Sequence, residues 1–120
     1  MIITCSKPPA LNHLYGVNKF GGKYLKSKGK AWKEEFMWRV RMEDLQNWDV
    51  PCSLTVKLFT AKHQDNDGIL KLLQDSIQAA GIIKDDYWIF DLRVLKFKVK
   101  KAVEEKIELE IKPIENEEKV

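Results

Sequence analysis

Two pairs of aspartates, separated by one predicted helix, are the residues whose types and spacing are best suited to chemistry. Asp65 and Asp67 stand two positions apart at the boundary between a predicted strand and a predicted helix. Asp85 and Asp86 follow that helix and precede the next predicted strand. In an extended segment, residues two positions apart project to the same side. If the strand after Asp86 pairs beside the strand before Asp65, we expect both acidic pairs to meet at one end of the sheet.

Three or four carboxylates gathered in this way predict a divalent metal site. Two unit charges about 4 Å apart at an effective dielectric of about 20 repel by about 4 kcal/mol, and a cation relieves that repulsion. Mg²⁺ prefers hard oxygen ligands and keeps several waters, one of which can attack phosphorus. Lys71 lies one turn into the helix, where we expect its ammonium to reach a scissile phosphate or a leaving oxygen. The chemistry indicated is metal-dependent phosphodiester hydrolysis, with Mn²⁺ as an alternative ion.

Each of these residues also has a purely structural interpretation. Asp67 precedes a glycine and an apolar run, so it is a good helix N-cap or turn residue. Lys71 and Asp75 have the spacing of a surface ion pair on a helix. Asp85 and Asp86 could form an ordinary turn before a strand. The joint pattern, rather than any single residue, favours catalysis.

Other metal-site interpretations fail on their spacing. An EF-hand calcium loop would need ligands at its first and twelfth positions, where this chain has His63 and Gln74. Neither His13 nor His63 has a partner at a zinc spacing, and we interpret both as non-catalytic. Cys5 and Cys52 are far apart, which is neither a metal spacing nor a disulfide framework and favours a reducing cytoplasm.

The elements that must position these residues alternate between strands and helices. Apolar patterns predict strands over 1–6, 53–59, 85–99 and 103–111. Helical spacing predicts helices over 29–45 and 67–80, whose buried stripes are Trp32, Phe36 and Val40, and Ile69, Leu72, Leu73, Ile77 and Ala80. The stretch 12–29 lacks a sustained period and is predicted to be a long loop, and a change of phase predicts a bulge near Val94. The order β-α-β-α-β-β predicts an α+β fold with two layers, a mixed β-sheet covered by two helices.

Length and composition predict one globular domain over residues 1–120. The chain has 120 residues, of which 44% are hydrophobic and 32% charged. The acidic end, from about 115 to 120, is expected to be a flexible tail. No apolar run approaches the roughly 20 residues that span a bilayer, and no signal peptide is visible. We therefore expect a cytoplasmic protein without a membrane partner.

Positive charge is segregated along the chain, although the net charge is only +3. An acid-free stretch from Val17 to Lys33 interleaves lysines with aromatic residues. Such a pattern suits phosphate contacts and stacking on unpaired bases of a nucleic acid. The alternative is a solvated loop whose aromatic side chains cover the core. A second basic cluster could likewise follow a DNA backbone or be an ordinary exposed strand face; it contains Arg93, Lys96, Lys98, Lys100 and Lys101.

Taken together, these motifs resemble those of the RusA family of Holliday-junction resolvases. The resemblance runs from Pro8-Pro9-Ala-Leu-Asn12-His-Leu-Tyr15 to about Pro113. It includes Gly22-Lys-Tyr24-Leu-Lys-Ser27, which is similar to the family's substrate loop. Its most specific part is Asp65-Asn-Asp67, then Lys71, then Ala80-Gly81-Ile-Ile-Lys-Asp85-Asp86, because this order spans a complete helix.

The resemblance implies a homodimer that binds four-way DNA junctions and makes paired, Mg²⁺-dependent nicks. It implies that Asp65, Asp67 and Asp86 are catalytic acids and metal ligands, that Lys71 is the essential lysine, and that Asp85 is a neighbouring acid. The residues expected to contact DNA are Asn12, Tyr15, Lys19, Lys23, Tyr24, Lys26, Ser27, Lys28, Lys30 and Lys62. The chain departs from the family pattern at Gln64, where a basic residue is usual, and at Gly68, where asparagine is common.

Two alternatives remain open at the level of the sequence. The substitutions at Gln64 and Gly68 are compatible with a related nuclease that cuts other branched or flap DNA. A non-catalytic DNA-binding module, in which the acids are only caps and turns, is a further alternative. The three functions differ in whether divalent metal is bound and which DNA is nicked.

Overall fold

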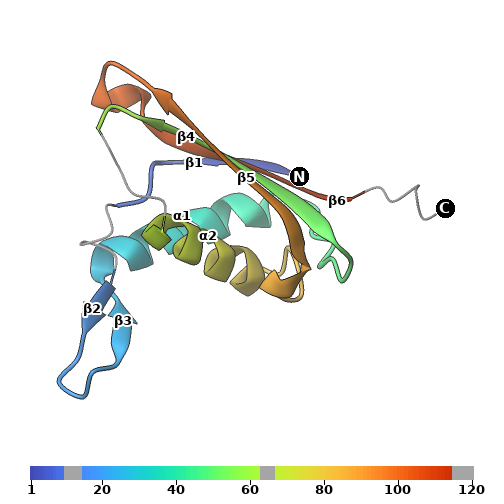
Figure 1. Cartoon of the computed structure of the whole chain (residues 1–120), viewed down its shortest axis with the longest axis horizontal. Coiled ribbons are helices and arrows are strands. Elements are labelled where there is room, and N and C mark those ends of the chain that lie inside the picture. Colours follow the sequence, from blue (N-terminus) through green and yellow to red (C-terminus); the bar gives the residue numbers. More distant parts are fainter. Residues whose placement is uncertain (10–14, 63–66, 115–120) are drawn as a thin grey trace.

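Four strands form one mixed sheet, and two helices cover one of its faces (Figure 1). The computed structural model describes residues 1–9, 15–62 and 67–114. Asn12, Asp65 and the tail 115–120 therefore lie outside the described residues. The elements are β1 (Ile2–Cys5), β2 (Tyr15–Val17), β3 (Lys23–Leu25), α1 (Ser27–Arg41), β4 (Cys52–Thr60), α2 (Asp67–Ala79), the 3-10 turn η2 (Asp86–Trp88), β5 (Ile89–Lys98), the 3-10 turn η3 (Ala102–Glu104) and β6 (Lys106–Pro113).

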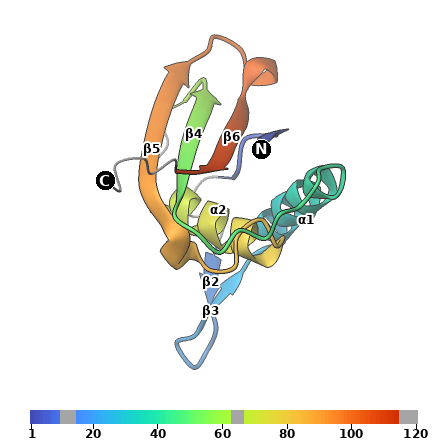
Figure 2. The same cartoon turned by 90° about the vertical axis from the view of Figure 1, so that its right-hand side faces the viewer.

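The sheet has the strand order β1-β6-β4-β5, with two antiparallel pairings and one parallel pairing. β6 runs antiparallel to both β1 and β4, whereas β4 and β5 are parallel and are connected through α2. Figure 2 shows the sheet above the two helices in a view along the helical layer. The predicted α+β fold, with a mixed sheet covered by two helices, is confirmed. Neither described helix is long and apolar enough to cross a membrane.

The core lies between the sheet and the two helices, as the apolar patterns predict. Alternate residues of β4 are 0–1% exposed: Leu54, Val56 and Leu58. The predicted stripes of both helices are buried, apart from Ala80, which is partly buried just after α2 ends. Trp32 stacks on Phe36 with ring centroids 5.4 Å apart, and its indole Nε1 donates to the Ser6 carbonyl at 2.7 Å. Trp32 is thus a core residue rather than an aromatic of a DNA-binding loop.

The segment predicted to be a long loop contains a β-hairpin instead. β2 and β3 pair antiparallel from Tyr15↔Leu25 to Val17↔Lys23, and the hairpin projects from the helical side of the molecule (Figure 1). The helix that follows starts at Ser27 and ends at Arg41, earlier at both ends than predicted. Strands of three residues are too short to show an alternating pattern, so a period search does not detect them.

β5 is an edge strand, and this explains its change of phase. Leu92 is paired with buried Leu54 and so lies on the helix-facing side, whereas Leu95 is paired with Lys57 on the outer face. The register is continuous from Asp91 to Lys98, and the only irregularity between β4 and β5 lies at the start of the ladder, between Cys52 and Ser53. The predicted bulge near Val94 is therefore wrong. The apolar residues change phase because an edge strand carries them on both faces.

The end of the chain also differs from the prediction in one place. Val103, predicted to belong to the last strand, lies in η3 and is 86% exposed. The strand itself begins at Lys106, and Ile107, Leu109 and Ile111 are completely buried. The turn predicted near Lys101 is thus extended by one 3-10 turn.

Candidate functional site

The parallel pairing of β4 and β5 separates the two acidic pairs within one chain. Cys52 at the start of β4 is paired with Ile89 at the start of β5, so Asp86 lies at the end of the sheet where β4 begins. Asp67 opens α2, after β4 has ended at the opposite end of the sheet. The 13 residues of α2 correspond to about 20 Å of helix. The expectation that both pairs meet at one end of the sheet in a single chain is wrong, because it requires antiparallel strands.

Asp85 and Asp86 form a carboxyl pair at the start of η2. The Asp85 carboxylate accepts a hydrogen bond from the Tyr87 backbone N–H at 3.0 Å, and this bond lowers the pKa of Asp85. The hydrogen bond between the two carboxyls raises the pKa of Asp86, and slight desolvation and the charges of Asp85 and Asp75 raise it further. Two carboxylates and Asp75 thus concentrate negative charge beside the last turns of α2. A cation bound there would relieve the repulsion.

Only some of the predicted catalytic side chains can be placed. Asp67 is the first residue of α2, but its side chain is not among those described, and Asp65 lies outside the described residues. Lys71, Asp85 and Asp86 are exposed. Within the described parts of the chain, no group of three or more acidic, histidine or cysteine side chains is arranged to hold a metal ion. Carboxylates suit a hard divalent cation. Among the described residues of one chain, however, only Asp85 and Asp86 lie together as candidate ligands.

The residues predicted to contact DNA lie mainly on the hairpin and the start of α1. Tyr15 and Lys23 are placed in β2 and β3 by their backbone alone, and Asn12 lies outside the described residues. Lys26 precedes α1 and is half-buried. The other predicted contacts are exposed: Lys19, Tyr24, Ser27, Lys28, Lys30 and Lys62.

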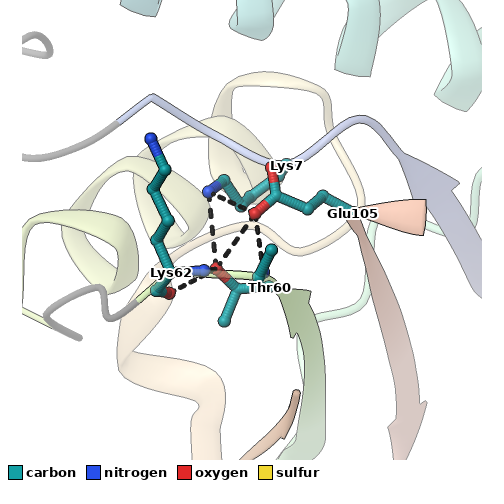
Figure 3. A network of polar contacts seen from close by, with 5 residues as sticks. Lys7, Thr60, Lys62 and Glu105 are labelled. Atoms are coloured by element: carbon teal, nitrogen blue, oxygen red, sulfur yellow. Dashed lines mark hydrogen bonds and ion pairs between the residues drawn. The ribbon is translucent and has the colours of Figure 1, made fainter. Parts of the chain in front are cut away.

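A polar network at the end of β4 was not detected from the sequence. The Glu105 carboxylate accepts a hydrogen bond from the Ala61 backbone N–H at 2.7 Å and lies 3.0 Å from the Lys7 ammonium (Figure 3). The Thr60 hydroxyl donates to the Lys62 carbonyl at 2.6 Å. These contacts hold the last residues before the segment that carries Asp65. Lys7 and Glu105 are 98 residues apart, and no spacing rule connects residues at such a separation.

Replacing Glu105 by glutamine is expected to destabilise the fold by about 1 to 2 kcal/mol, because the charge-assisted bonds are lost. The Ala61 hydrogen bond, and after it the Lys7 ammonium, lower the pKa of Glu105 below its usual 4.5. A lowered pKa in the folded state stabilises the protein above pH 4.5, and this stabilisation is lost as the pH falls through the lowered value. Urea unfolding at several pH values should therefore show a difference between wild type and Glu105→Gln that is constant near neutral pH and shrinks in acid.

Glu108→Gln provides the control for this prediction. Glu108 and Lys57 form an ion pair with a 3.9 Å separation on the outer face of the sheet. Such exposed pairs contribute about 0 to 1 kcal/mol. If the two variants lose the same stability, or if the Glu105→Gln difference is independent of pH, the network does not have the assigned role.

An open, basic hollow lies beside the same end of β4. It has a volume of about 310 Å³ and is lined by Thr60, Ala61, Lys62, Lys96, Phe97 and Lys98. Three of its six lining residues are lysines, and Phe97 on its wall stacks on Phe59 with ring centroids 4.9 Å apart. A rigid aromatic wall with several ammonium groups suits a phosphate backbone. The hollow adjoins the point where the chain leaves β4 toward Asp67.

Comparison with known proteins identifies the family of this chain. The profile of the family described as "Endodeoxyribonuclease RusA" matches residues 7–112. The chain is also similar to the crossover junction endodeoxyribonuclease RusA of Aquifex aeolicus (strain VF5), with 30% identity over 100 residues, which cover 80% of this chain and 78% of the relative. The match includes both acidic pairs, the helices α1 and α2, the strands β2 to β5, and all but the last residue of β6. The chain belongs to the RusA family of endodeoxyribonucleases.

Proposed function

We propose that this protein is a Mg²⁺-dependent resolvase that acts as a homodimer and makes paired nicks in four-way DNA junctions. The observation that carries the proposal is the position of the acids at opposite ends of α2, beside an edge strand with exposed apolar residues. A second copy can complete the site that one chain leaves divided. The proposal rests on family membership for the reaction and on this arrangement for the dimer.

The edge strand β5 is the surface we assign to the second copy. Within the described parts of the chain, β5 has a strand neighbour on one side only. An edge strand presents unpaired backbone N–H and C=O groups that can pair with a strand of another chain. Its exposed apolar side chains, which a partner would cover, are Phe90, Leu92, Leu95 and Phe97, at 39–57% exposure. Tyr87 extends this surface and contacts Phe90 edge-on at 5.7 Å between ring centroids.

A two-fold axis across β5 would bring the separated acids together. Two identical strands related by such an axis run antiparallel. The start of β5 in one copy then lies beside the end of β5 in the other, and the register places that end next to Thr60 at the end of β4. Asp85 and Asp86 of one copy would thereby approach the segment of the other copy that leads to Asp67. Two equivalent sites would result, one for each nick.

In this dimer, Asp65 and Asp67 of one copy and Asp86 of the other would hold the metal, with Asp85 beside them. Bound Mg²⁺ would lower the pKa of a coordinated water and offset charge on the phosphate. The exposed Lys71 lies on α2 one turn after Asp67. Its role would be to bind a phosphate oxygen and to stabilise the leaving oxygen.

A synthetic mobile four-way junction tests the reaction directly. With Mg²⁺ or Mn²⁺, we expect symmetric nicks in two opposing strands, and with chelator we expect none, because the carboxylates alone cannot activate water. Labelling each strand in turn and resolving the products on a denaturing gel identifies the nicks. Absence of nicking under every metal condition would instead favour the non-catalytic DNA-binding module.

Gln64 and Gly68 are also compatible with a nuclease that cuts other branched or flap DNA. Both positions depart from the usual family pattern directly beside the acids. The same assay with three-way, flap and linear DNA separates the two functions. A resolvase cuts the four-way junction preferentially, whereas faster cutting of flap or three-way DNA would assign the protein to the alternative class.

A further inference from the structure

The tip of the β2–β3 hairpin carries a phenylalanine that is not packed into the protein. Phe20 is 86% exposed, and Val17 at the end of β2 is 65% exposed. The hairpin projects from the body of the molecule in both views (Figures 1 and 2), so the core cannot cover this ring. Burial of a phenylalanine side chain is worth about 1.5 to 3 kcal/mol. A ring left in water at the end of a projecting element is therefore available to a ligand.

The backbone of the tip is held in a defined shape. The Asn18 side-chain oxygen accepts hydrogen bonds from the Phe20 and Gly22 backbone N–H groups, both at 2.9 Å. The Asn18 N–H donates to the Gly22 carbonyl at 2.8 Å, and the Gly21 N–H donates back to the Asn18 carbonyl at 3.0 Å. Gly21 has a φ of +84°, which other residue types rarely adopt. These bonds present the Phe20 ring on a rigid turn, so its placement costs little conformational entropy on binding.

The charge around the ring favours a polyanion as the ligand. The Lys19 ammonium lies over the Phe20 ring, 5.2 Å from its centroid. No acidic residue occurs between Val17 and Lys33, whereas lysines recur throughout this stretch. A protein partner would meet this surface through acidic side chains, but an exposed aromatic ring flanked by ammonium groups matches the stacked base and flanking phosphates of a nucleic acid.

The hairpin also lies at the end of the helical layer where Asp67 and Lys71 are found. Figure 1 shows that it hangs from the end at which both α1 and α2 begin. α2 begins at Asp67 and carries Lys71 one turn later. A DNA strand held at this end can therefore meet the hairpin as well as the proposed catalytic residues.

We propose that Phe20 inserts at the branch point of the DNA junction and stacks on a base exposed there. This inference deepens the proposed function and rests on it for the branched substrate. The branch point is where base stacking is interrupted, so a ring can enter without the full unstacking cost of a continuous duplex. Lys19 would bind the phosphate beside that base. Phe20 would thus contribute to the preference for branched over linear DNA.

Phe20→Ala is expected to weaken binding of a four-way junction about tenfold, which corresponds to about 1.4 kcal/mol. Binding of linear duplex should change less than twofold, and Phe20→Trp should retain junction affinity because its ring also stacks. The dissociation constants are measured by fluorescence anisotropy in chelator, so that neither metal binding nor cleavage affects them. Val103→Ala is the matched control, because Val103 is equally exposed but lies in η3.

A second readout reports the insertion itself. With 2-aminopurine at the branch point, wild-type protein is expected to raise the fluorescence by unstacking the base from its neighbours, and Phe20→Ala is expected to lose that rise. Unchanged junction affinity and fluorescence in Phe20→Ala would overturn the inference. Equal weakening on junction and linear duplex would also overturn it, since that result indicates a general backbone contact. Because both assays work without metal, they are independent of whether the protein cleaves.

Discussion

A mixture of the Asp67→Asn and Asp86→Asn variants is expected to regain cleavage that neither variant has alone. Each variant by itself should be slowed more than about 100-fold, because even loss of a residue that only supports a metal ligand costs 10- to 100-fold. In a dimer with shared sites, a mixed dimer has one site with both aspartates intact and one site with both replaced. It should therefore nick one strand of a junction but fail to make the paired nick.

The measurement uses a junction labelled on each strand, after the two variants have been mixed and allowed to exchange protomers. Each single variant is expected to bind the junction as tightly as wild type or more tightly, because a negative charge has been removed near the DNA. Mixing Asp67→Asn with Lys71→Ala is the matched control. Both of these residues lie on α2 of the same chain, so no mixed dimer has an intact site and no activity should return.

The outcomes of this experiment test separately whether the site is shared between two copies and which residues belong to it. If wild type cleaves the junction but the Asp67/Asp86 mixture regains no cleavage, each site is built from one chain and the shared arrangement is wrong. Restoration in the control mixture would contradict the placement of Asp67 and Lys71 in the same site. Full cleavage by Asp67→Asn alone would remove that residue from the catalytic group.

The variant Leu92→Lys/Leu95→Lys is expected to be monomeric and to lose junction cleavage as completely as the Asp67→Asn and Asp86→Asn variants. The two leucines are on opposite faces of β5 near its middle, with 39% and 45% exposure. Lysines on an edge strand oppose strand pairing, and a two-fold axis would bring the introduced charges of both copies close together. Because each site would need both copies, loss of the dimer removes both nicks.

Analytical ultracentrifugation gives the oligomeric state, and a junction assay at the same protein concentration gives the activity. Thermal unfolding must show that the variant is folded, since Leu92 is also paired with buried Leu54. Val103→Lys, at an exposed position in η3, adds positive charge away from β5 and should remain an active dimer. A double-lysine variant that is still dimeric and active would exclude β5 as the interface.

Local sequence patterns predicted most of the secondary structure. The helical spacing of Ile69, Leu72 and Ile77 located α2 to within one residue, because one face of a surface helix must be apolar to pack. The alternation in β4 located that strand for the same reason with a period of two. The short hairpin strands and the edge strand escaped correct prediction, since neither has the simple one-sided burial on which such patterns depend.

Side-chain types and their spacing along the chain were enough to predict the two-layer α+β fold and the family, because both are local properties. The catalytic residues that they indicate stay a prediction. The folded structure was needed to establish that β4 and β5 are parallel, and hence that Asp67 and Asp86 lie at opposite ends of the sheet. It also decided that Lys7 and Glu105 meet at the end of β4 and that Phe20 is left in water. Strand direction and contacts between distant residues depend on how the whole chain packs, and no local spacing encodes them.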